Sequence, residues 1–266
     1  MSTKRKLPIA LTVAGSDSGG GAGVQADLKT FASLGVHGTS AITCLTAQNP
    51  RGVSGIQACR AELIVKQIEA VASALPPAAV KTGMLFSASI IRAAAQALRH
   101  LKSVPVVVDP VMIATSGAPL LQPRAISDLQ THIFSIATLI TPNVDEARAL
   151  SGMRIRDPED LRACAKRLYS KFGCAVLVKG GHLSKLNEAL DLFFDGTTEL
   201  LLSAPYVRRI STHGTGCTYS SAIAAYLAQG RNLRRAVELA KEYISCAIGQ
   251  SHSVGRHTAL NHFWKK

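Results

Sequence analysis

The segment His213–Thr218 places two glycines and a cysteine immediately before the apolar run Tyr219–Leu227. Gly214 and Gly216 let the backbone turn tightly and direct its amide N–H groups at one point, and a helix that begins there adds its positive dipole end. Such a turn is suited to phosphate. A thiol at a helix N-terminus has a lowered pKa, so Cys217 is expected to be a thiolate near neutral pH, available as a base. The competing interpretation is a capped helix with a buried cysteine.

A second glycine-rich segment, Gly19–Gly23, follows the apolar run Leu7–Ala14. It is not a Walker A sequence, because no Gly-Lys-Ser/Thr follows, and it lacks the Rossmann spacing with an acidic residue closing the next strand. Its glycines still allow the backbone to approach a ligand closely, although a flexible strand-to-helix turn is the alternative. Asp27, one turn into the following helix, could hydrogen-bond a ligand hydroxyl or stabilise the helix start.

Five further polar residues lie at or just beyond the ends of predicted strands. The amide of Gln48 suits the edge of an aminopyrimidine, or it is an ordinary turn glutamine. Asn143 and Glu146 have the spacing of a helix capping box, and Glu146 with Asp109 across the cleft could instead hold Mg²⁺ through water. Lys179 could neutralise phosphate charge or simply end a strand with its ammonium in water.

These residues sit in a regular alternation of apolar strands and amphipathic helices. Continuous apolar strands predict burial on both faces, and their alternation with helices predicts a three-layer α/β/α fold with a central, mostly parallel sheet. We expect residues 1–266 to form a single domain, with ligands beyond the carboxyl ends of the strands. The last two strands are expected to form an antiparallel hairpin around Asp195–Thr198. Predicted strands are Ile9–Ala14, Gly38–Leu45, Ala79–Thr82, Val104–Asp109, Thr138–Thr141, Ala175–Lys179, Glu188–Phe194 and Glu199–Ser203, and predicted helices are Ala22–Leu34, Ala61–Ala74, Ser87–His100, Pro123–Ile133, Val144–Ser151, Pro158–Phe172, Cys217–Gln229 and Leu233–Gln250.

Composition narrows the class of partner. A formal charge of +13 favours an anionic ligand such as a nucleotide or a phosphorylated metabolite. The positive charge is scattered and aromatic residues are only 5%, which argues against nucleic acid. The six cysteines show no zinc-like spacing and indicate a reduced, cytosolic protein. The start Lys4-Arg5-Lys6 before an apolar run is interpreted as the approach to a first buried strand rather than a signal peptide, and no run is long enough for a membrane span.

Taken together, the motifs resemble the hydroxymethylpyrimidine/phosphomethylpyrimidine kinases of thiamine biosynthesis, a family with the ribokinase-like fold. The resemblance covers nearly the whole chain and implies two successive ATP-dependent steps. The first phosphorylates the hydroxymethyl group of 4-amino-5-hydroxymethyl-2-methylpyrimidine, and the second converts that monophosphate to the diphosphate. The motifs are Ala14–Asp17, Gly20–Thr30, Ala47–Asn49, Lys81–Leu85, Val108–Met112, Leu139–Asn143, Val178–His182 and His213–Thr218.

The resemblance also implies roles for single residues. The turn Gly214–Cys217, which includes Thr215 and Gly216, would form an anion hole, with Cys217 as the base that takes the alcohol proton. Gln48 would bind the pyrimidine edge. The remaining implied roles are acceptor-pocket lining for Asp27, Gly15 and Met84, Mg²⁺ binding for Glu146, and binding of the cofactors ATP and Mg²⁺ for Asn143, Lys179 and Asp109.

The chain departs from the family near its end, where Ser253–His262 replaces the usual Gly-His-Gly-Pro segment before a closing Asn-His. Because that segment lies on the nucleotide side, the departure bears on ATP contacts rather than on the acceptor. A pyridoxal-type vitamin kinase is the nearest alternative function, and a catalytically silent ligand-binding regulator is another. The resemblance further implies a homodimer.

Overall fold

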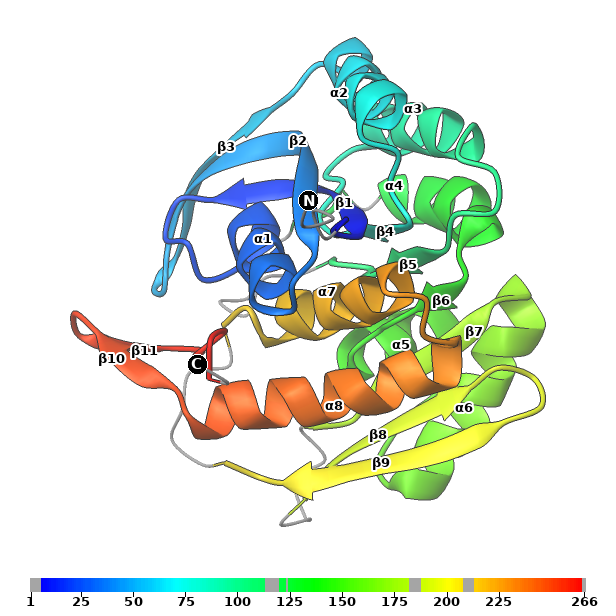
Figure 1. The fold of residues 1–266 in the computed structure, drawn as a ribbon. Coiled ribbons are helices and arrows are strands. Elements are labelled where there is room, and N and C mark those ends of the chain that lie inside the picture. Colours follow the sequence, from blue (N-terminus) through cyan, green and yellow to red (C-terminus); the bar gives the residue numbers. More distant parts are fainter. Residues whose placement is uncertain (1–5, 113–119, 123, 182–187, 208–212, 265–266) are drawn as a thin grey trace.

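The computed structural model describes residues 6–112, 120–122, 124–181, 188–207 and 213–264. Its centre is a nine-stranded sheet with the order β3-β2-β1-β4-β5-β6-β7-β8-β9 (Figure 1). The strands from β2 to β7 along this order pair in parallel, whereas β3, β8 and β9 add antiparallel edges. The predicted three-layer α/β/α architecture with a mostly parallel sheet is therefore confirmed.

The elements follow one another as strand–helix units through most of the chain. The strands are β1 Ile9–Asp17, β2 His37–Asn49, β3 Gly52–Ala58, β4 Ala79–Thr82, β5 Val106–Val108, β6 Leu139–Ile140, β7 Ala175–Lys179, β8 Glu188–Phe194, β9 Glu199–Pro205, β10 His252–Val254 and β11 His257–Ala259. The helices are α1 Gly23–Ser33, α2 Ala61–Ala74, α3 Ala88–Arg99, α4 Ala125–Asp128, α5 Val144–Ser151, α6 Pro158–Phe172, α7 Thr215–Ala228 and α8 Leu233–Gly249.

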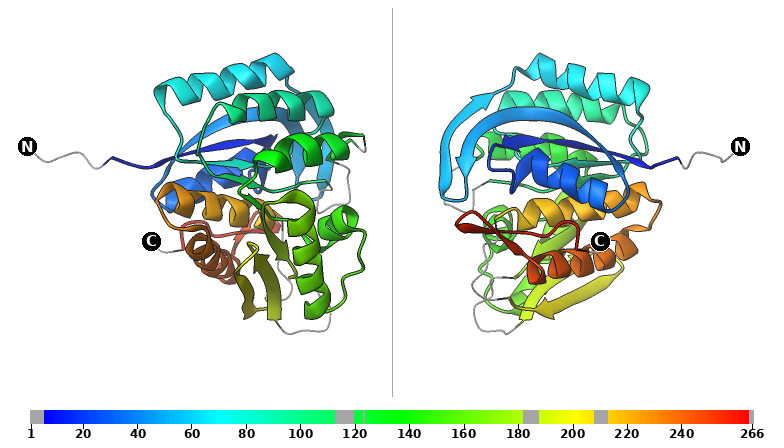
Figure 2. Two further views of the ribbon diagram at one scale, coloured as in Figure 1. Left: turned by 90° about the vertical axis from the view of Figure 1, so that its right-hand side faces the viewer. Right: turned by 60° about the vertical axis from the view of Figure 1, so that its left-hand side comes forward.

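Two apolar cores cover the two faces of the sheet, because side chains that alternate along each strand point to opposite faces. On one face, Leu11 of β1 belongs to the core formed with α2 to α6. On the other, Ala10 belongs to the core formed with α1, α7 and α8. Figure 2 shows the two helical layers from two further directions. Along the described parts of the chain, no helix combines the length and apolarity that a membrane span requires.

The structure differs from the prediction most in four places, besides shifts of one to three residues at the ends of other elements. The second strand continues to Asn49 and pairs with β3, whose glycines at 52 and 55 weaken the strand pattern. The predicted strand Val104–Asp109 forms a strand only over Val106–Val108. The predicted helix Pro123–Ile133 is a short α4 followed by π-helical and 3₁₀ turns. The divergent C-terminal segment forms the hairpin β10–β11, which turns at Gly255 with φ +59°.

Pro123 and His182, which the predictions included, lie outside the described residues, as do Lys4 and Arg5.

Candidate active site

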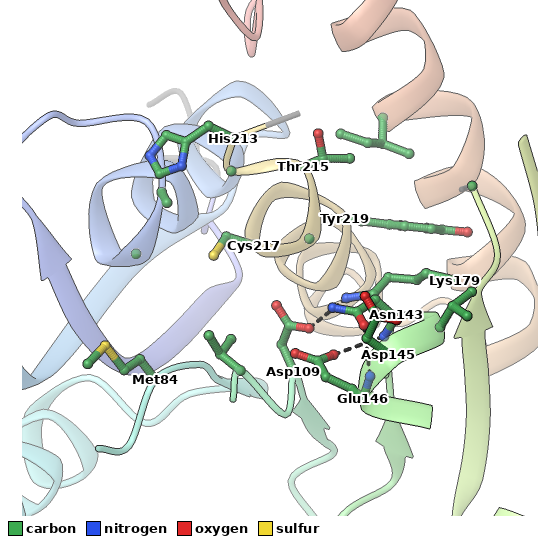
Figure 3. Close-up of a pocket in the computed structure, with 18 of the residues that line it drawn as sticks. Met84, Asp109, Asn143, Asp145, Glu146, Lys179, His213, Thr215, Cys217 and Tyr219 are labelled. Atoms are coloured by element: carbon green, nitrogen blue, oxygen red, sulfur yellow. Dashed lines mark hydrogen bonds and ion pairs between the residues drawn. The ribbon is translucent and has the colours of Figure 1, made fainter. Parts of the chain in front are cut away.

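A cavity of about 780 Å³ runs along the carboxyl edge of the parallel strands. Ligands bind at this edge in open α/β sheets. Figure 3 shows Cys217 projecting from the start of α7, between Met84 on one side and Asp109 with Glu146 on the other. The predicted site residues that line this cavity are Gly15, Gln48, Met84, Asp109, Asn143, Glu146, Lys179, Gly214, Thr215, Gly216 and Cys217.

The turn before α7 has the conformation that an anion site needs. Gly214 is its N-cap and adopts φ +81°, a left-handed conformation that L side chains rarely take. A Cβ at this position would lie 1.8 Å from the carbonyl oxygen of Gly21, so the two glycine-rich segments touch backbone to backbone. Thr215 begins the helix, and its Oγ1 is buried with no hydrogen-bond partner among the described residues. The free first-turn N–H groups and this hydroxyl can receive phosphate oxygens.

Asp17 at the end of β1 ties the first glycine-rich loop to this turn. Its Oδ1 accepts a hydrogen bond from the backbone N–H of Gly19 at 2.8 Å, and its Oδ2 accepts from those of Gly21 at 3.1 Å and Ala22 at 2.8 Å. The same Oδ2 lies 2.9 Å from His213 Nε2. The sequence motifs include Asp17 and His213 but do not indicate a role for either. The missed signal is an acidic residue two positions before a run of glycines whose N–H groups need an acceptor.

We expect Asp17→Asn to lower the free energy of unfolding by about 2 kcal/mol, because an NH₂ group replaces one acceptor of charge-assisted hydrogen bonds. Burial raises the pKa of Asp17, but the bonds from His213, Gly19 and Ala22 outweigh it and hold the pKa below its ordinary value of 3.8. The carboxylate therefore stabilises the fold above that pH, and the contribution is lost as the pH falls further. Denaturant unfolding between pH 7 and pH 3 measures this.

Asp195 provides the matched control, since it accepts similar backbone bonds in the β8–β9 turn, away from the cavity. Asp17→Asn and Asp195→Asn should both lower the free energy of unfolding at pH 7. Only Asp17→Asn should also loosen the turn at Gly214. If stability falls below pH 4 as steeply in Asp17→Asn as in the unmodified protein, the assigned role of this carboxylate is wrong.

Cys217 lies in the cavity as predicted, but its predicted acidity is wrong. Burial raises the pKa of its thiol to about 11, and the positive charge of Lys81 is partly offset by the carboxylates of Asp27 and Asp109. The sequence revealed the helix start that favours a thiolate but not the two carboxylates that oppose it. The thiol is therefore protonated near neutral pH in the ligand-free protein.

Asn143 and Glu146 form the capping box at the start of α5. Asn143 Oδ1 accepts a hydrogen bond from the backbone N–H of Glu146, and Glu146 Oε2 accepts from that of Asn143, both at 2.9 Å. The structural interpretation of this pair is thus confirmed, yet Glu146 also lines the cavity. Burial raises its pKa, which Lys179 partly lowers and Asp109 raises again. A buried acid facing a second acid is a place where an added cation would be favoured.

Asp109 and Lys179 form an ion pair on the cavity floor. Lys179 Nζ donates to Asp109 Oδ1 at 2.7 Å, and Thr141 Oγ1 donates to the same oxygen at 3.2 Å. Over the described residues, no cluster of three His, Cys, Asp or Glu side chains could hold a metal by protein ligands alone. Mg²⁺ needs only one or two carboxylates when waters and phosphates complete its shell, so Glu146 and Asp109 fit this ion.

One end of the cavity has the character of a site for a small ring. Gly15 lies against it, and a Cβ there would come within 2.8 Å of Cys44 Sγ and 3.4 Å of Met84 Sδ. Thr46 Oγ1 donates to the carbonyl of Ser16 at 2.8 Å and lies 3.1 Å from Gln48 Oε1. Small and apolar lining residues with one side-chain amide among them suit a heterocycle with polar edges.

Asp27 is the one predicted site residue that the cavity does not include. It is fully buried below the floor, and both of its oxygens lie within 2.9 Å of Lys81 Nζ. Neither expected role, contact with a ligand hydroxyl or support of the helix start, is available to a carboxylate that is already paired in the core. The structure thus corrects the assignment of Asp27 to the acceptor pocket.

The opposite end of the cavity contains a second buried ion pair that the sequence analysis missed. Lys241 Nζ in α8 donates to Asp191 Oδ2 of β8 at 2.7 Å, and Asp191 Oδ1 accepts from the backbone N–H of Gly180 at 3.0 Å. Both charged residues line the cavity. The available signal was an acidic residue inside an otherwise apolar strand.

The chain is similar to known proteins in sequence and in fold. The family model described as Phosphomethylpyrimidine kinase matches residues 17–261. The hydroxymethylpyrimidine/phosphomethylpyrimidine kinase of Bacillus subtilis is 44% identical, over 96% of this chain and 94% of that protein. The thiamine biosynthesis bifunctional protein ThiED of Geobacter sulfurreducens is 50% identical over 95% of this chain, which spans about half (51%) of that longer protein. Among solved structures, an ADP complex of Bacillus subtilis pyridoxal kinase is 35% identical with a TM-score of 0.89, covering 97% of this chain and 98% of that one.

Proposed function

The chain belongs to the phosphomethylpyrimidine kinase family, and we propose that it performs two ATP-dependent phosphorylations in thiamine biosynthesis. The first acceptor is the hydroxymethyl group of 4-amino-5-hydroxymethyl-2-methylpyrimidine, and the second is the phosphate of the resulting monophosphate. The observation that carries the proposal is one continuous cavity with the Gly214–Cys217 turn between a ring-sized pocket and a second, charged end. An acceptor and a nucleotide can therefore meet at the turn.

The ring-sized pocket supports an aminopyrimidine acceptor. Gln48 offers an amide to the polar edge of the ring, while Gly15 and Met84 line the cavity beside it. The opposite end, between β8 and α8, is the place for the nucleotide, since Asp191 and Lys241 set its polar wall there. Phosphoryl transfer needs positioning and charge stabilisation more than covalent work by the protein, and this arrangement supplies both.

The turn and its neighbours would stabilise the charge that develops during transfer. The first N–H groups of α7 and the Thr215 hydroxyl would donate hydrogen bonds to the transferred phosphoryl group. Because these donors are already in place, they need not reorganise during the reaction. Lys179 adds a fixed positive charge from the floor. Glu146, with Asp109 beside it, would hold Mg²⁺ through water, and the ion would supply positive charge against the phosphates. Cys217 would accept the alcohol proton in the first step.

A coupled assay of ATP consumption with Mg²⁺ tests this proposal, using hydroxymethylpyrimidine, its monophosphate and pyridoxal as separate acceptors. Turnover of the first two is the expected result. Turnover of pyridoxal alone would overturn the acceptor assignment and keep the kinase, an outcome that the similarity to a pyridoxal kinase structure makes worth testing. No turnover on any acceptor would favour a ligand-binding regulator.

We expect Gly15→Ala to raise the KM for the pyrimidine about tenfold, because its Cβ would lie 2.8 Å from Cys44 Sγ and 3.4 Å from Met84 Sδ, so the wall of the pocket must shift. The KM for ATP should stay unchanged. Adding Cys44→Ala removes the nearer sulfur and should restore part of the affinity. Gly55→Ala is the matched control, since its Cβ would meet only Ala47 Cβ, at 3.7 Å. Equal changes in both KM values would show that Gly15 does not shape the acceptor pocket.

We also propose that the chain forms a single domain, that it is a homodimer and that it is cytosolic. These three statements stay predictions. The length of the chain supports the single domain, its cysteine pattern supports the cytosolic location, and the resemblance of the motifs supports the homodimer.

A further inference from the structure

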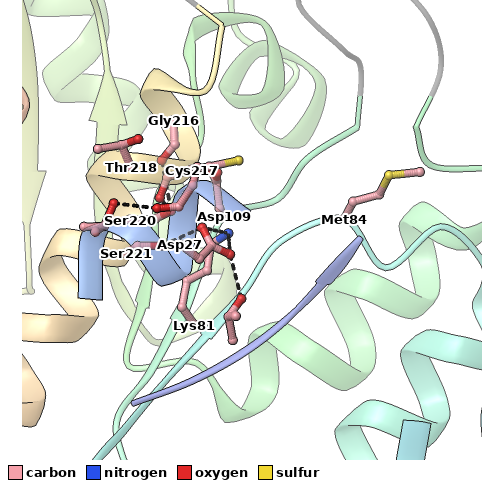
Figure 4. Close-up of polar contacts among 12 residues, drawn as sticks. Asp27, Lys81, Met84, Asp109, Gly216, Cys217, Thr218, Ser220 and Ser221 are labelled. Carbon is pink, nitrogen blue, oxygen red and sulfur yellow. Dashed lines mark hydrogen bonds and ion pairs between the residues drawn. The ribbon is translucent and has the colours of Figure 1, made fainter. Parts of the chain in front are cut away.

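A fully buried ion pair lies directly under the start of α7. Lys81 of β4 and Asp27 of α1 both have no exposed side-chain surface, and Lys81 Nζ lies 2.9 and 2.8 Å from the two carboxylate oxygens. Figure 4 shows the pair below the helical turn that carries Cys217. A buried ion pair seldom stabilises a fold, because the desolvation of two charges offsets their attraction. Its presence here therefore calls for a role other than stability.

Asp27 is saturated with hydrogen bonds from three neighbouring elements. Besides Lys81, Thr12 Oγ1 of β1 donates to Oδ2 and Ser221 Oγ of α7 donates to Oδ1, both at 2.6 Å. The carboxylate is thus fixed in place. Ser221 lies four residues after Cys217, which puts the two side chains on the same face of α7. The network consequently holds the turn of the helix next to the one that carries the thiol.

Lys81 lies nearer the cavity than Asp27, although its own side chain has no exposed surface. It is among the lining residues, whereas Asp27 is not. A lysine ammonium has three N–H donors, and its hydrogen-bond partners among the described residues are the two oxygens of Asp27. Its positive charge acts on Cys217 and on Asp109 across the floor. Lys81 and Cys217 thus border the same cavity, and the positive charge of Lys81 lowers the pKa of the thiol whereas the carboxylate of Asp27 raises it.

We propose that Lys81 is a positioning residue that stabilises the thiolate of Cys217 in the alcohol-phosphorylating step, and that Asp27 keeps Lys81 charged and in place. This inference rests on the proposed function. Before transfer, the Cys217 thiol releases its proton to water. The alcohol oxygen then bonds to the terminal phosphorus of ATP while the bond from that phosphorus to the ADP oxygen breaks, and the alcohol proton passes to the Cys217 sulfur. Lys81 neither bonds to the substrate nor exchanges a proton.

The partnership with Asp27 explains how a buried lysine can do this. Burial alone lowers the pKa of a lysine and would leave it neutral. The nearby carboxylate of Asp27 reverses that effect and raises the pKa of Lys81. The second-step acceptor is a phosphate oxygen that is already largely ionised. That step has little need of a thiolate, so the influence of Lys81 should be confined to the first step.

The double variant Asp27→Asn/Lys81→Met tests the proposal, because removing both charges leaves no uncompensated ion in the core. Alkylation of Cys217 by iodoacetamide is followed by peptide mass spectrometry between pH 7 and pH 9. We expect alkylation about tenfold slower than in the unmodified protein at each pH, equivalent to a rise of about one unit in the thiol pKa. The rate of the alcohol-phosphorylating step should fall by a factor about tenfold larger than the rate of the phosphate step. Asp27→Asn/Lys81→Gln, which can hydrogen-bond through its amides, is the second variant if the first does not fold.

Thr39→Val is the matched control, since it removes a buried hydrogen bond to the carbonyl of Ala10 and leaves both charges and every partner of Asp27 in place. It should leave the alkylation rate of Cys217 and the ratio of the two steps unchanged. A folded double variant with an unchanged alkylation rate and equal losses in both steps would overturn the role of Lys81. Alkylation needs no turnover, so this result is separable from a failure of the proposed function, which would appear as no turnover in the unmodified protein.

Discussion

Replacing Gly214 with alanine is expected to reduce both phosphorylation steps by about 10²–10³-fold, the loss typical of removing an oxyanion-hole donor. Its Cβ would lie 1.8 Å from the carbonyl oxygen of Gly21, so the turn or the first glycine-rich loop must move. The change also disfavours φ +81°. The turn serves both steps, so both rates should fall together. Separate initial-rate assays of the two acceptors measure this.

Gly230 provides a close control for Gly214, because it has the same φ of +81° at the end of α7, but a Cβ added there would meet no atom within 4 Å. Gly230→Ala should cost about 1 kcal/mol of stability and leave the rates near those of the unmodified protein. The difference between the two variants isolates the clash with Gly21. Comparable rates in the two variants would mean that close contact of the glycine-rich segments is not needed for catalysis.

Elements with strong local signals could be predicted to the residue. Helix α6 begins after the N-cap Asp157 with a proline in its first turn, and it ends at Phe172, before the C-cap Gly173. The sequence predicted these bounds as the structure has them. Strand β3 had no such signal. It is half exposed, contains glycines, and is a strand because it pairs with the end of β2.

The residues that line the site could be predicted from the sequence better than their pKa values and ion pairs. The strand ends carrying Asp109, Asn143 and Lys179 meet because parallel strands share a carboxyl edge, which topology alone ensures. The pKa of Cys217 and the burial of Asp27 depend on contacts between residues far apart in sequence. No local pattern shows that the carboxylate of Asp27 is taken by a lysine 54 residues later. Long-range pairing therefore accounts for both corrections.

Cys217→Ala is expected to slow the alcohol step by about 10²–10⁴-fold, the range for loss of a general base. The rate of the phosphate step should fall much less, because its acceptor oxygen is already largely ionised. Cys246→Ala, on α8, is the matched control and should change neither step. Separate assays with hydroxymethylpyrimidine and with its monophosphate measure the two losses.

The pH dependence of the alcohol step then distinguishes a base from a merely structural thiol. With a thiol pKa of about 11, the thiolate fraction rises about tenfold for each pH unit between 7 and 9. The rate of the unmodified protein should rise with pH in that interval when proton transfer limits it, and the rate of Cys217→Ala should not. A pH-independent rate in both proteins, or equal losses in the two steps, would mean that Cys217 fills space at the helix start and that water takes the alcohol proton.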